Sequence, residues 1–140
     1  MTKATSKKKS DAVHVSGKRK RAIARATLKP GTGKISINGI LLNHYGSEML
    51  RQRILEPIRL AGVTAEKADV AISVRGGGVT GQADAVRLAI ARAFATMDQS
   101  LRQVFLEYDR QLLVADVRRK ESAKPNSHGQ ARSKTQKSYR

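Results

Sequence analysis

The N-terminal third of the chain carries two stretches in which apolar and polar residues alternate. From Ala22 to Leu28, small or apolar residues occupy every second position, which predicts a β-strand whose other face is partly basic. The alternation restarts at Ile35 and Ile37, after the turn-forming residues 30–33 (Pro-Gly-Thr-Gly). We therefore expect two strands joined as a β-hairpin.

Helical spacing dominates the stretches that follow. Within residues 47–60 the large apolar residues recur three and four positions apart, with Ser47 placed to cap the helix and Pro57 expected to kink or shorten it. Residues 86–97 repeat this spacing, and the apolar positions of residues 101–105 indicate a further short helix. The pattern thus predicts three helices.

A third strand is predicted between the first two helices, where Val70, Ile72 and Val74 alternate with smaller or polar residues. The apolar residues 112–114 form either a last strand or an apolar anchor. The resulting order, β-β-α-β-α-α, is typical of an α+β fold with helices packed on one β-sheet. A chain of 140 residues is long enough for one such domain.

Positive charge is concentrated at the two ends of the chain. Lys and Arg outnumber Asp and Glu by 28 to 11, for a formal net charge of +17. Residues 1–25 hold nine basic residues against one acidic residue, and residues 110–140 hold nine against two. We expect a basic N-terminal arm at 1–15, an α+β domain at 16–117 and an extended basic tail at 118–140, with both extensions becoming ordered on a polyanion.

A polyanionic partner follows from this charge, because self-repulsion disfavours the isolated compact state. The chain has two Phe, three Tyr and no Trp, which favours contacts to phosphate over stacking on bases. The main alternative to an RNA-binding protein is a chromatin or general DNA-compacting protein, which is also small and basic.

Enzyme, cofactor and membrane functions find little support. The chain has no Cys, and His14, His44 and His128 lack the spacing of metal ligands. No spacing pairs a His with a carboxylate, so we expect neither an enzyme nor a small-molecule substrate. The apolar stretches are shorter than the about 20 residues of a membrane span. Residues 1–10 lack the apolar region of a secretory signal, and they lack the Arg typical of a transit peptide, so we expect a cytoplasmic protein.

Residues 75–83 (Arg-Gly-Gly-Gly-Val-Thr-Gly-Gln-Ala) form a glycine-rich segment between a predicted strand and a predicted helix. Such a segment can cradle phosphate with its backbone N–H groups. Gly76 and Gly81 fit the frame of a P-loop, but Gln82 and Ala83 stand where the motif needs Lys and Ser or Thr. Without those groups, nucleoside triphosphate chemistry has no basis.

The same glycines also fit the dinucleotide-binding frame G-x-G-x-x-G, through Gly76, Gly78 and Gly81. The acidic residue that this motif requires would be Asp98, which falls beyond a helix instead of at the end of a strand. Two interpretations of the glycines stay open. They permit a tight turn with positive φ, or they let the backbone approach RNA phosphate with help from Arg75, and both can hold together.

Several motifs resemble those of a single family, the ninth ribosomal protein of the small subunit. The most specific block is Arg75-Gly76-Gly77-Gly78 with Gly81-Gln82-Ala83-Asp84-Ala85 and Ala89-Ile90-Ala91-Arg92-Ala93. Before it stand the run from Ser16 to Ala26, Ile37-Asn38-Gly39 and Glu56-Pro57, and after it Asp116, Arg118-Arg119-Lys120 and the terminal Gln136-Lys137-Ser138-Tyr139-Arg140. The resemblance runs from Ser16 to Arg140 in the family's order.

The chain end and residues 105–110 resemble the archaeal and eukaryotic branch of this family more than the bacterial one. Val117 departs from the Pro that this branch often has, and residues 121–128 differ from its usual Lys/Gly-rich version. These departures affect the expected path of the middle of the tail.

The resemblance implies a fold similar to the second domain of the fifth small-subunit ribosomal protein. It also implies a place in the head of the subunit, on the 3′ major domain of the rRNA and next to other ribosomal proteins. The family's C-terminal tail reaches toward the anticodon stem-loop of P-site tRNA, which points to Arg140 and, more weakly, to Lys137 as tRNA contacts. We expect no cofactor, metal or membrane partner. The expected rRNA-binding residues are the basic and glycine positions Lys18, Arg19, Lys20, Arg21, Arg25, Arg75, Gly76, Gly77, Gly78, Gly81, Gln82, Arg118, Arg119, Lys120, Arg132 and Lys134.

Overall fold

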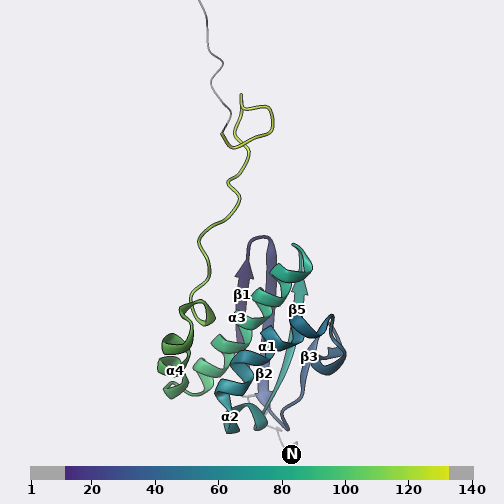
Figure 1. Ribbon diagram of the computed structural model, residues 1–140, viewed down its shortest axis with the longest axis vertical. Coiled ribbons are helices and arrows are strands. Elements are labelled where there is room, and N and C mark those ends of the chain that lie inside the picture. The colour runs from purple at the N-terminus through teal and green to yellow at the C-terminus, as the bar shows by residue number, and fades with distance from the viewer. Residues whose placement is uncertain (1–11, 133–140) are drawn as a thin grey trace, which may run out of the picture.

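The computed structural model of the protein describes residues 12–132, in which one sheet is flanked by helices (Figure 1). The strands are β1 (Val13–Arg19), β2 (Ala22–Pro30), β3 (Ile35–Ile37), β4 (Ile40–Leu41) and β5 (Ala68–Arg75). The helices are α1 (Glu48–Ala61), α2 (Val63–Glu66), α3 (Val79–Met97) and α4 (Ser100–Tyr108), with the short 3-10 helices η1 (Leu42–His44) and η2 (Arg110–Leu112). Within the described residues, no helix combines the length and the apolar character that crossing a membrane requires.

The five strands form one mixed sheet in the order β1-β2-β5-β3-β4. Strand β2 runs antiparallel to both β1 and β5, whereas β3 runs parallel to β5. The three predicted strands are confirmed as β2, β3 and β5. The predicted hairpin between the first two is wrong, because β5 lies between β2 and β3.

The connection from β2 to β3 crosses the start of β5 instead of turning back on β2. The Asp69 carboxylate accepts hydrogen bonds from the backbone N–H groups of Thr32 and Lys34, at 2.8 and 2.9 Å. The Gly31 N–H donates to the Lys67 carbonyl at 2.9 Å. The turn residues therefore do reverse the chain, but the loop lies against the start of β5, where the Asp69 carboxylate binds it. Local sequence patterns do not show a contact with a residue so distant in sequence.

Strand β1 lies partly in the segment 1–15 that the charge pattern assigns to a basic arm. It pairs along its whole length with β2, and Val13 and Val15 pack against the core. The alternation that would predict this strand is broken at Gly17. A Cβ there would meet the Ala85 carbonyl oxygen of α3 at 2.2 Å, so glycine allows the helix to approach the strand. The expected domain boundary after residue 15 therefore falls inside a strand.

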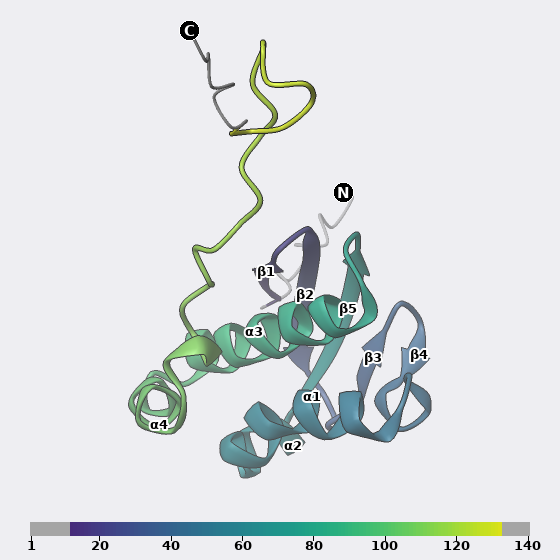
Figure 2. The ribbon, with the colours of Figure 1, turned by 45° about the horizontal axis from the view of Figure 1, so that its top comes forward.

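Helices α1 and α3 cover one face of the sheet (Figure 2). The alternate residues of β2 that face them are buried, as are nine residues of α3, five of them alanines. Such small side chains let the helix and the sheet approach closely. The expected α+β architecture, one domain with helices packed on one sheet, is confirmed.

The three predicted helices are confirmed as α1, α3 and α4. Ser47 occupies the N-cap position of α1, although its side chain makes no capping hydrogen bond. Pro57 does not shorten this helix, which continues to Ala61 with Pro57 buried. The apolar residues 112–114 form no strand. Leu112 ends η2 with its side chain fully buried, which matches the alternative of an apolar anchor.

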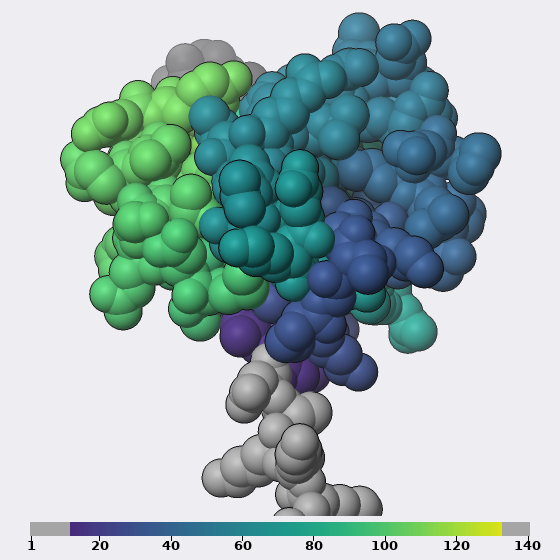
Figure 3. Space-filling view, turned by 90° about the horizontal axis from the view of Figure 1, so that it is seen from below, coloured from purple at the N-terminus to yellow at the C-terminus, as the bar shows by residue number. Residues whose placement is uncertain are grey.

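Beyond η2, residues 113–132 contain no helix or strand and lead toward the end of the domain where the β1–β2 hairpin turns (Figure 1). The other end of the domain is formed by α2, α4 and the connection from β2 to β3 (Figure 3). The two ends are called here the hairpin end and the α2 end.

Candidate nucleic-acid interface

The tip of the β1–β2 hairpin presents a short basic run. Arg19 pairs with Ala22, so the turn itself consists of Lys20 and Arg21, and Lys20 takes the left-handed conformation at φ 51°. Both turn side chains are exposed to solvent, and Lys18 beside them is half-buried. The ladder of β1 and β2 therefore fixes basic side chains at this end of the sheet without help from a ligand.

The glycine-rich segment lies directly beside this tip. Strand β5 ends at Arg75, which pairs with Ile23, and Gly76 and Gly77 follow with φ of 77° and 66°. A Cβ on Gly76 would meet the Arg21 carbonyl oxygen at 2.7 Å. One on Gly77 would lie 2.9 Å from the backbone nitrogen of Ala22. These two glycines thus provide a tight turn that packs against the hairpin, which supports the structural interpretation of the motif.

Gly78 differs from its two neighbours. Its φ is −108°, a value open to any residue, and an added Cβ would meet nothing within 4 Å. It occupies the N-cap position of α3 without a side-chain cap, so the first N–H groups of this helix face the hairpin end. The fold itself therefore does not require glycine at position 78. If a side chain there impairs binding, the reason would be close approach of a partner such as RNA phosphate.

The structure also explains why a P-loop reaction has no place here. The Gln82 side-chain amide donates to the Gly76 carbonyl at 3.1 Å, and so closes the loop on itself. Ala83 is fully buried in the helix. Within residues 12–132, no group of three or more acidic or histidine side chains is arranged to hold a metal ion.

The segment that follows η2 passes close to the hairpin tip. Residues of this segment and of the hairpin line an open groove of about 760 Å³. Its basic lining residues are Lys18, Lys20 and Arg21 from the hairpin and Arg118, Arg119 and Lys120 from the segment after η2. These six were all expected to bind rRNA, and the structure brings them together.

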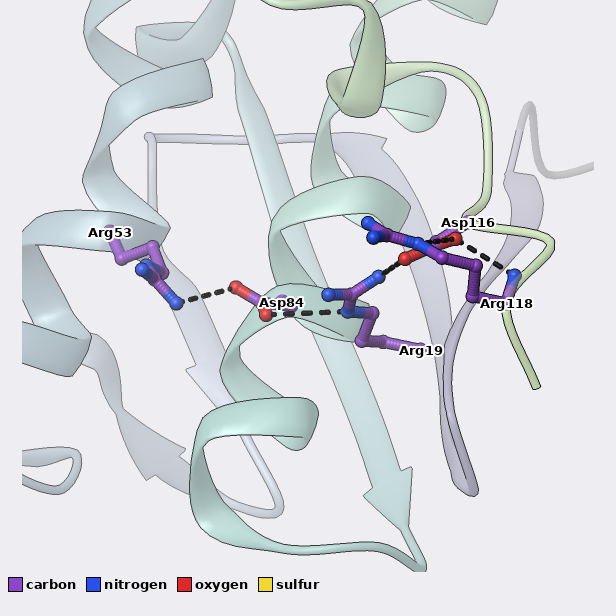
Figure 4. A network of polar contacts seen from close by, with 5 residues as sticks. All are labelled: Arg19, Arg53, Asp84, Asp116 and Arg118. Carbon is purple, nitrogen blue, oxygen red and sulfur yellow. Dashed lines mark hydrogen bonds and ion pairs between the residues drawn. The ribbon is translucent and has the colours of Figure 1, made fainter. Parts of the chain in front are cut away.

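Arg19 has a different environment from the other basic residues of the hairpin. It forms ion pairs with Asp84 of α3, at 3.7 Å, and with Asp116 of the segment after η2 (Figure 4). Asp84 also pairs with Arg53 of α1 at 3.0 Å, and Asp116 with Arg118 at 3.3 Å. Arg19 was expected to bind rRNA. In the structure its guanidinium instead contacts two carboxylates of its own chain.

Sequence reasoning missed the structural roles of Asp84, Asp116 and Arg92. The Arg92 guanidinium donates to the Leu113 carbonyl at 2.9 Å and to the Ser16 carbonyl at 2.8 Å, and so ties the segment after η2 to β1. A signal for Asp116 was present, because it is one of only two acidic residues in the strongly basic stretch 110–140. An acidic side chain among so many cations is favourably placed to form an ion pair with one of them.

The remaining expected contacts are more scattered. Arg25 is exposed on the face of β2 that no helix covers, and Arg75 is exposed at the end of β5. Gly81 lies in the first turn of α3. Arg132 pairs with Glu121 at 2.9 Å, within the tail. Three expected contacts, Lys134, Lys137 and Arg140, lie outside the described residues.

Comparison with known proteins identifies the family. The profile of a family described as ribosomal protein S9/S16 matches residues 17–140. The small ribosomal subunit protein uS9 of Thermoplasma volcanium is 52% identical over 132 residues, which cover 93% of this chain and 99% of the relative. The uS9 proteins of Picrophilus torridus and Methanothrix thermoacetophila are each 49% identical, covering 94% and 91% of this chain and 99% and 98% of their own lengths. The motifs and these similarities agree, and the chain belongs to the ribosomal protein S9/S16 family.

Proposed function

We propose that this chain is a structural constituent of the small ribosomal subunit, in the cytoplasm, and that its hairpin end binds the rRNA. The observation that carries the proposal is the convergence of three features at one end of the sheet. These are the basic hairpin tip, the glycine turn with the N-terminus of α3, and the basic segment after η2. In the subunit head, the 3′ major domain of the rRNA would occupy this end.

Membership of a ribosomal protein family makes the chain a structural protein and not an enzyme. Phosphate contacts suit that role, because Lys and Arg side chains can fix the position of a protein on folded RNA without reading its sequence. Backbone N–H groups at the start of α3 add an uncharged contribution of the same kind. Neighbouring proteins of the head would complete the surroundings of the domain.

The C-terminal tail has a second task in this proposal. We assign to Arg140, and more weakly to Lys137, a contact with the anticodon stem-loop of P-site tRNA. A guanidinium can form two charge-assisted hydrogen bonds to a phosphate whatever the base sequence, as a contact made to every tRNA requires. Support comes from the match of the family profile, which extends to residue 140.

Sedimentation tests the ribosomal part of the proposal. The native protein should sediment with small subunits in high-salt gradients, where weakly bound basic proteins dissociate. Release at moderate salt, or sedimentation with DNA instead, would favour the alternative of a DNA-compacting protein.

Dissociation of tRNA tests the tail. Small subunits assembled with a protein that lacks residues 137–140 should release P-site tRNA faster than subunits with the full chain. One charged hydrogen-bonded contact contributes about 1.5–3 kcal/mol at most, and other contacts hold the tRNA, so the effect should be partial. Subunits carrying Glu107→Ala, a change on the exposed surface of α4, serve as the control. Equal dissociation rates at several salt concentrations would refute the tail contact without affecting the rRNA proposal.

A further inference from the structure

The chain from the end of η2 onward is attached to the domain at three successive points. Leu112 is fully buried in the core. One residue later, the Leu113 carbonyl accepts from the Arg92 guanidinium. At Asp116 the carboxylate pairs with Arg19, and its side chain is only 10% exposed. Beyond this residue, the side chains of Val117 to Lys120 are exposed.

Asp116 therefore stands where the attached part of the chain ends. Its carboxylate also accepts a hydrogen bond from the backbone N–H of Arg118 at 2.9 Å, which turns the chain just beyond the attachment. Figure 4 shows that Arg19 lies between Asp84 and Asp116, and so joins α3, the hairpin and the tail. On the far side of Asp84, Arg53 extends the chain of ion pairs to α1.

The groove lies next to this attachment, and its lining on the tail side starts at Arg118, two residues after Asp116. One wall carries Lys18, Lys20 and Arg21, and the other carries Arg118, Arg119 and Lys120. The groove is open, with a volume of about 760 Å³. Cations on both walls suit a polyanionic strand that passes between them.

From these contacts we infer that Asp116 is a positioning residue, which holds the start of the tail beside the hairpin tip through Arg19, so that both walls bind one strand of rRNA backbone. The inference rests on the proposed rRNA-binding function. A tail held in this way loses less conformational freedom on binding than an unattached one, so its cations bind with less loss of entropy. Arg19 contributes by holding Asp116, not by touching RNA.

Charge and position predict opposite results for the loss of Asp116, which makes the inference testable. Asp116→Ala makes the protein more positive by one charge, and electrostatics alone would then strengthen binding to any RNA. Positioning predicts weaker binding to a transcript of the 3′ major domain of small-subunit rRNA, by roughly two- to tenfold. Binding to poly(U), which has no fixed shape to match the groove, should stay equal or rise.

Glu107→Ala is the matched control, because it removes the same charge from the exposed surface of α4, away from the groove. Its affinity for both RNAs should equal or slightly exceed that of the unmodified protein. Asp116 lies beyond Leu112, the last fully buried residue of the described part of the chain, so the core should survive its loss. Thermal melting of each variant checks this. If Asp116→Ala binds the rRNA transcript as tightly as Glu107→Ala does, the inference is wrong.

A double-substitution cycle separates positioning from direct contact. If Arg19 acts only through Asp116, Arg19→Gln should lower rRNA affinity more in the unmodified protein than in Asp116→Ala, where only the general effect of one lost positive charge remains. An equal loss in both backgrounds would show that Arg19 contacts RNA itself and would overturn the assigned role.

The position of the tail can also be measured without RNA. The chain has no Cys, so Lys20→Cys and Ser122→Cys provide two unique sites for spin labels. The distribution of distances between the labels should be narrow, and it should broaden in Asp116→Ala but not in Glu107→Ala. An unchanged distribution would refute the attachment. If the unmodified protein failed to prefer rRNA over poly(U), the proposed function would fail, and this measurement would still decide whether Asp116 holds the tail.

Discussion

The hairpin tip and the segment after η2 carry the same kind of side chain but are held in place in different ways. The hairpin is fixed by a continuous strand ladder, with β5 and the glycine turn packed beside it. The segment after η2 is fixed by the buried Leu112 just before it, by the Arg92 guanidinium and by one ion-pair network. A few side chains therefore suffice to hold the basic tail in position, and changes in the tail should affect binding more than folding.

The largest effect should come from removing charge from the tail wall of the groove. A protein with Arg118, Arg119 and Lys120 all changed to Gln should lose affinity for rRNA by on the order of a hundredfold at about 0.1 M salt. Each lost phosphate contact should lower the slope of log affinity against log salt by about 0.7–0.9. Thermal melting of the free protein should not change. An unaltered salt slope would show that this segment does not contact phosphate.

The next largest effect is expected in the glycine turn beside the hairpin, where a substitution should lower the stability of the fold. Gly77→Ala places a Cβ at positive φ and 2.9 Å from the Ala22 backbone nitrogen, so it should lower the free energy of unfolding by about 1–3 kcal/mol. Gly78→Ala is the matched control and should stay within about 0.5 kcal/mol in urea denaturation. Equal stability of the two variants would contradict the turn geometry. If Gly78→Ala nevertheless weakens rRNA binding, RNA approaches the backbone there.

A smaller loss of stability is expected where the two regions are tied together. Arg92→Met removes the donors to the Ser16 and Leu113 carbonyls but keeps an unbranched apolar stem of similar reach. Hydrogen bonds to charged groups contribute about 1.5–3 kcal/mol each, and partial exposure of both sites should leave a loss of about 1–2 kcal/mol. Arg118→Met, on the exposed tail, should leave stability unchanged. If urea denaturation gave Arg92→Met and Arg118→Met the same free energy of unfolding, the stabilising role of Arg92 would be contradicted.

The smallest effect should appear at the α2 end, which the proposed interface does not include. Hydrogen bonds from the backbone N–H groups of Lys34 and Thr32 lower the pKa of Asp69 from its ordinary value of 3.8. A lowered pKa in the folded state means that the carboxylate stabilises the fold above pH 3.8 and that this contribution disappears as the pH falls through the lowered pKa. Asp69→Asn should therefore have a slightly lower melting temperature than the unmodified protein at neutral pH. The two melting temperatures should converge in acid. A difference in melting temperature that grew as the pH fell would contradict the lowered pKa of Asp69. A loss of rRNA binding in Asp69→Asn would show that the α2 end takes part in binding RNA.

Sequence patterns predicted the elements of this fold better than their arrangement. Period-two and helical spacing identified β2, β3, β5 and the three long helices, because each buries one face against the same core. They could not show that β5 separates β2 from β3, since that order is set by backbone pairing of β5 with both strands, between residues more than thirty positions apart. Strand β1 escaped prediction because Gly17, needed for contact with α3, interrupts the alternation.

For the candidate site as well, the sequence predicted most of the residues but not how they are arranged. Clustered charge and glycine identified most of the residues that the structure gathers at the hairpin end. The distinct role of Arg19 was not predictable, because its neighbours Lys18 and Lys20 look the same in sequence, and only the fold brings Asp84 and Asp116 to its side.

Site-directed cleavage of rRNA tests the central claim most directly. Single cysteines in place of Lys20, Ser122 or Glu66 would each carry an iron chelate that cleaves nearby RNA in assembled small subunits. We expect the probes at positions 20 and 122 to cut the same stretch of rRNA, because the hairpin tip and the tail line one groove. The probe at position 66, in α2 at the opposite end, should leave that stretch intact. Cuts from positions 20 and 122 in unrelated stretches, or strongest cleavage of that stretch from position 66, would contradict a shared rRNA strand at the hairpin end.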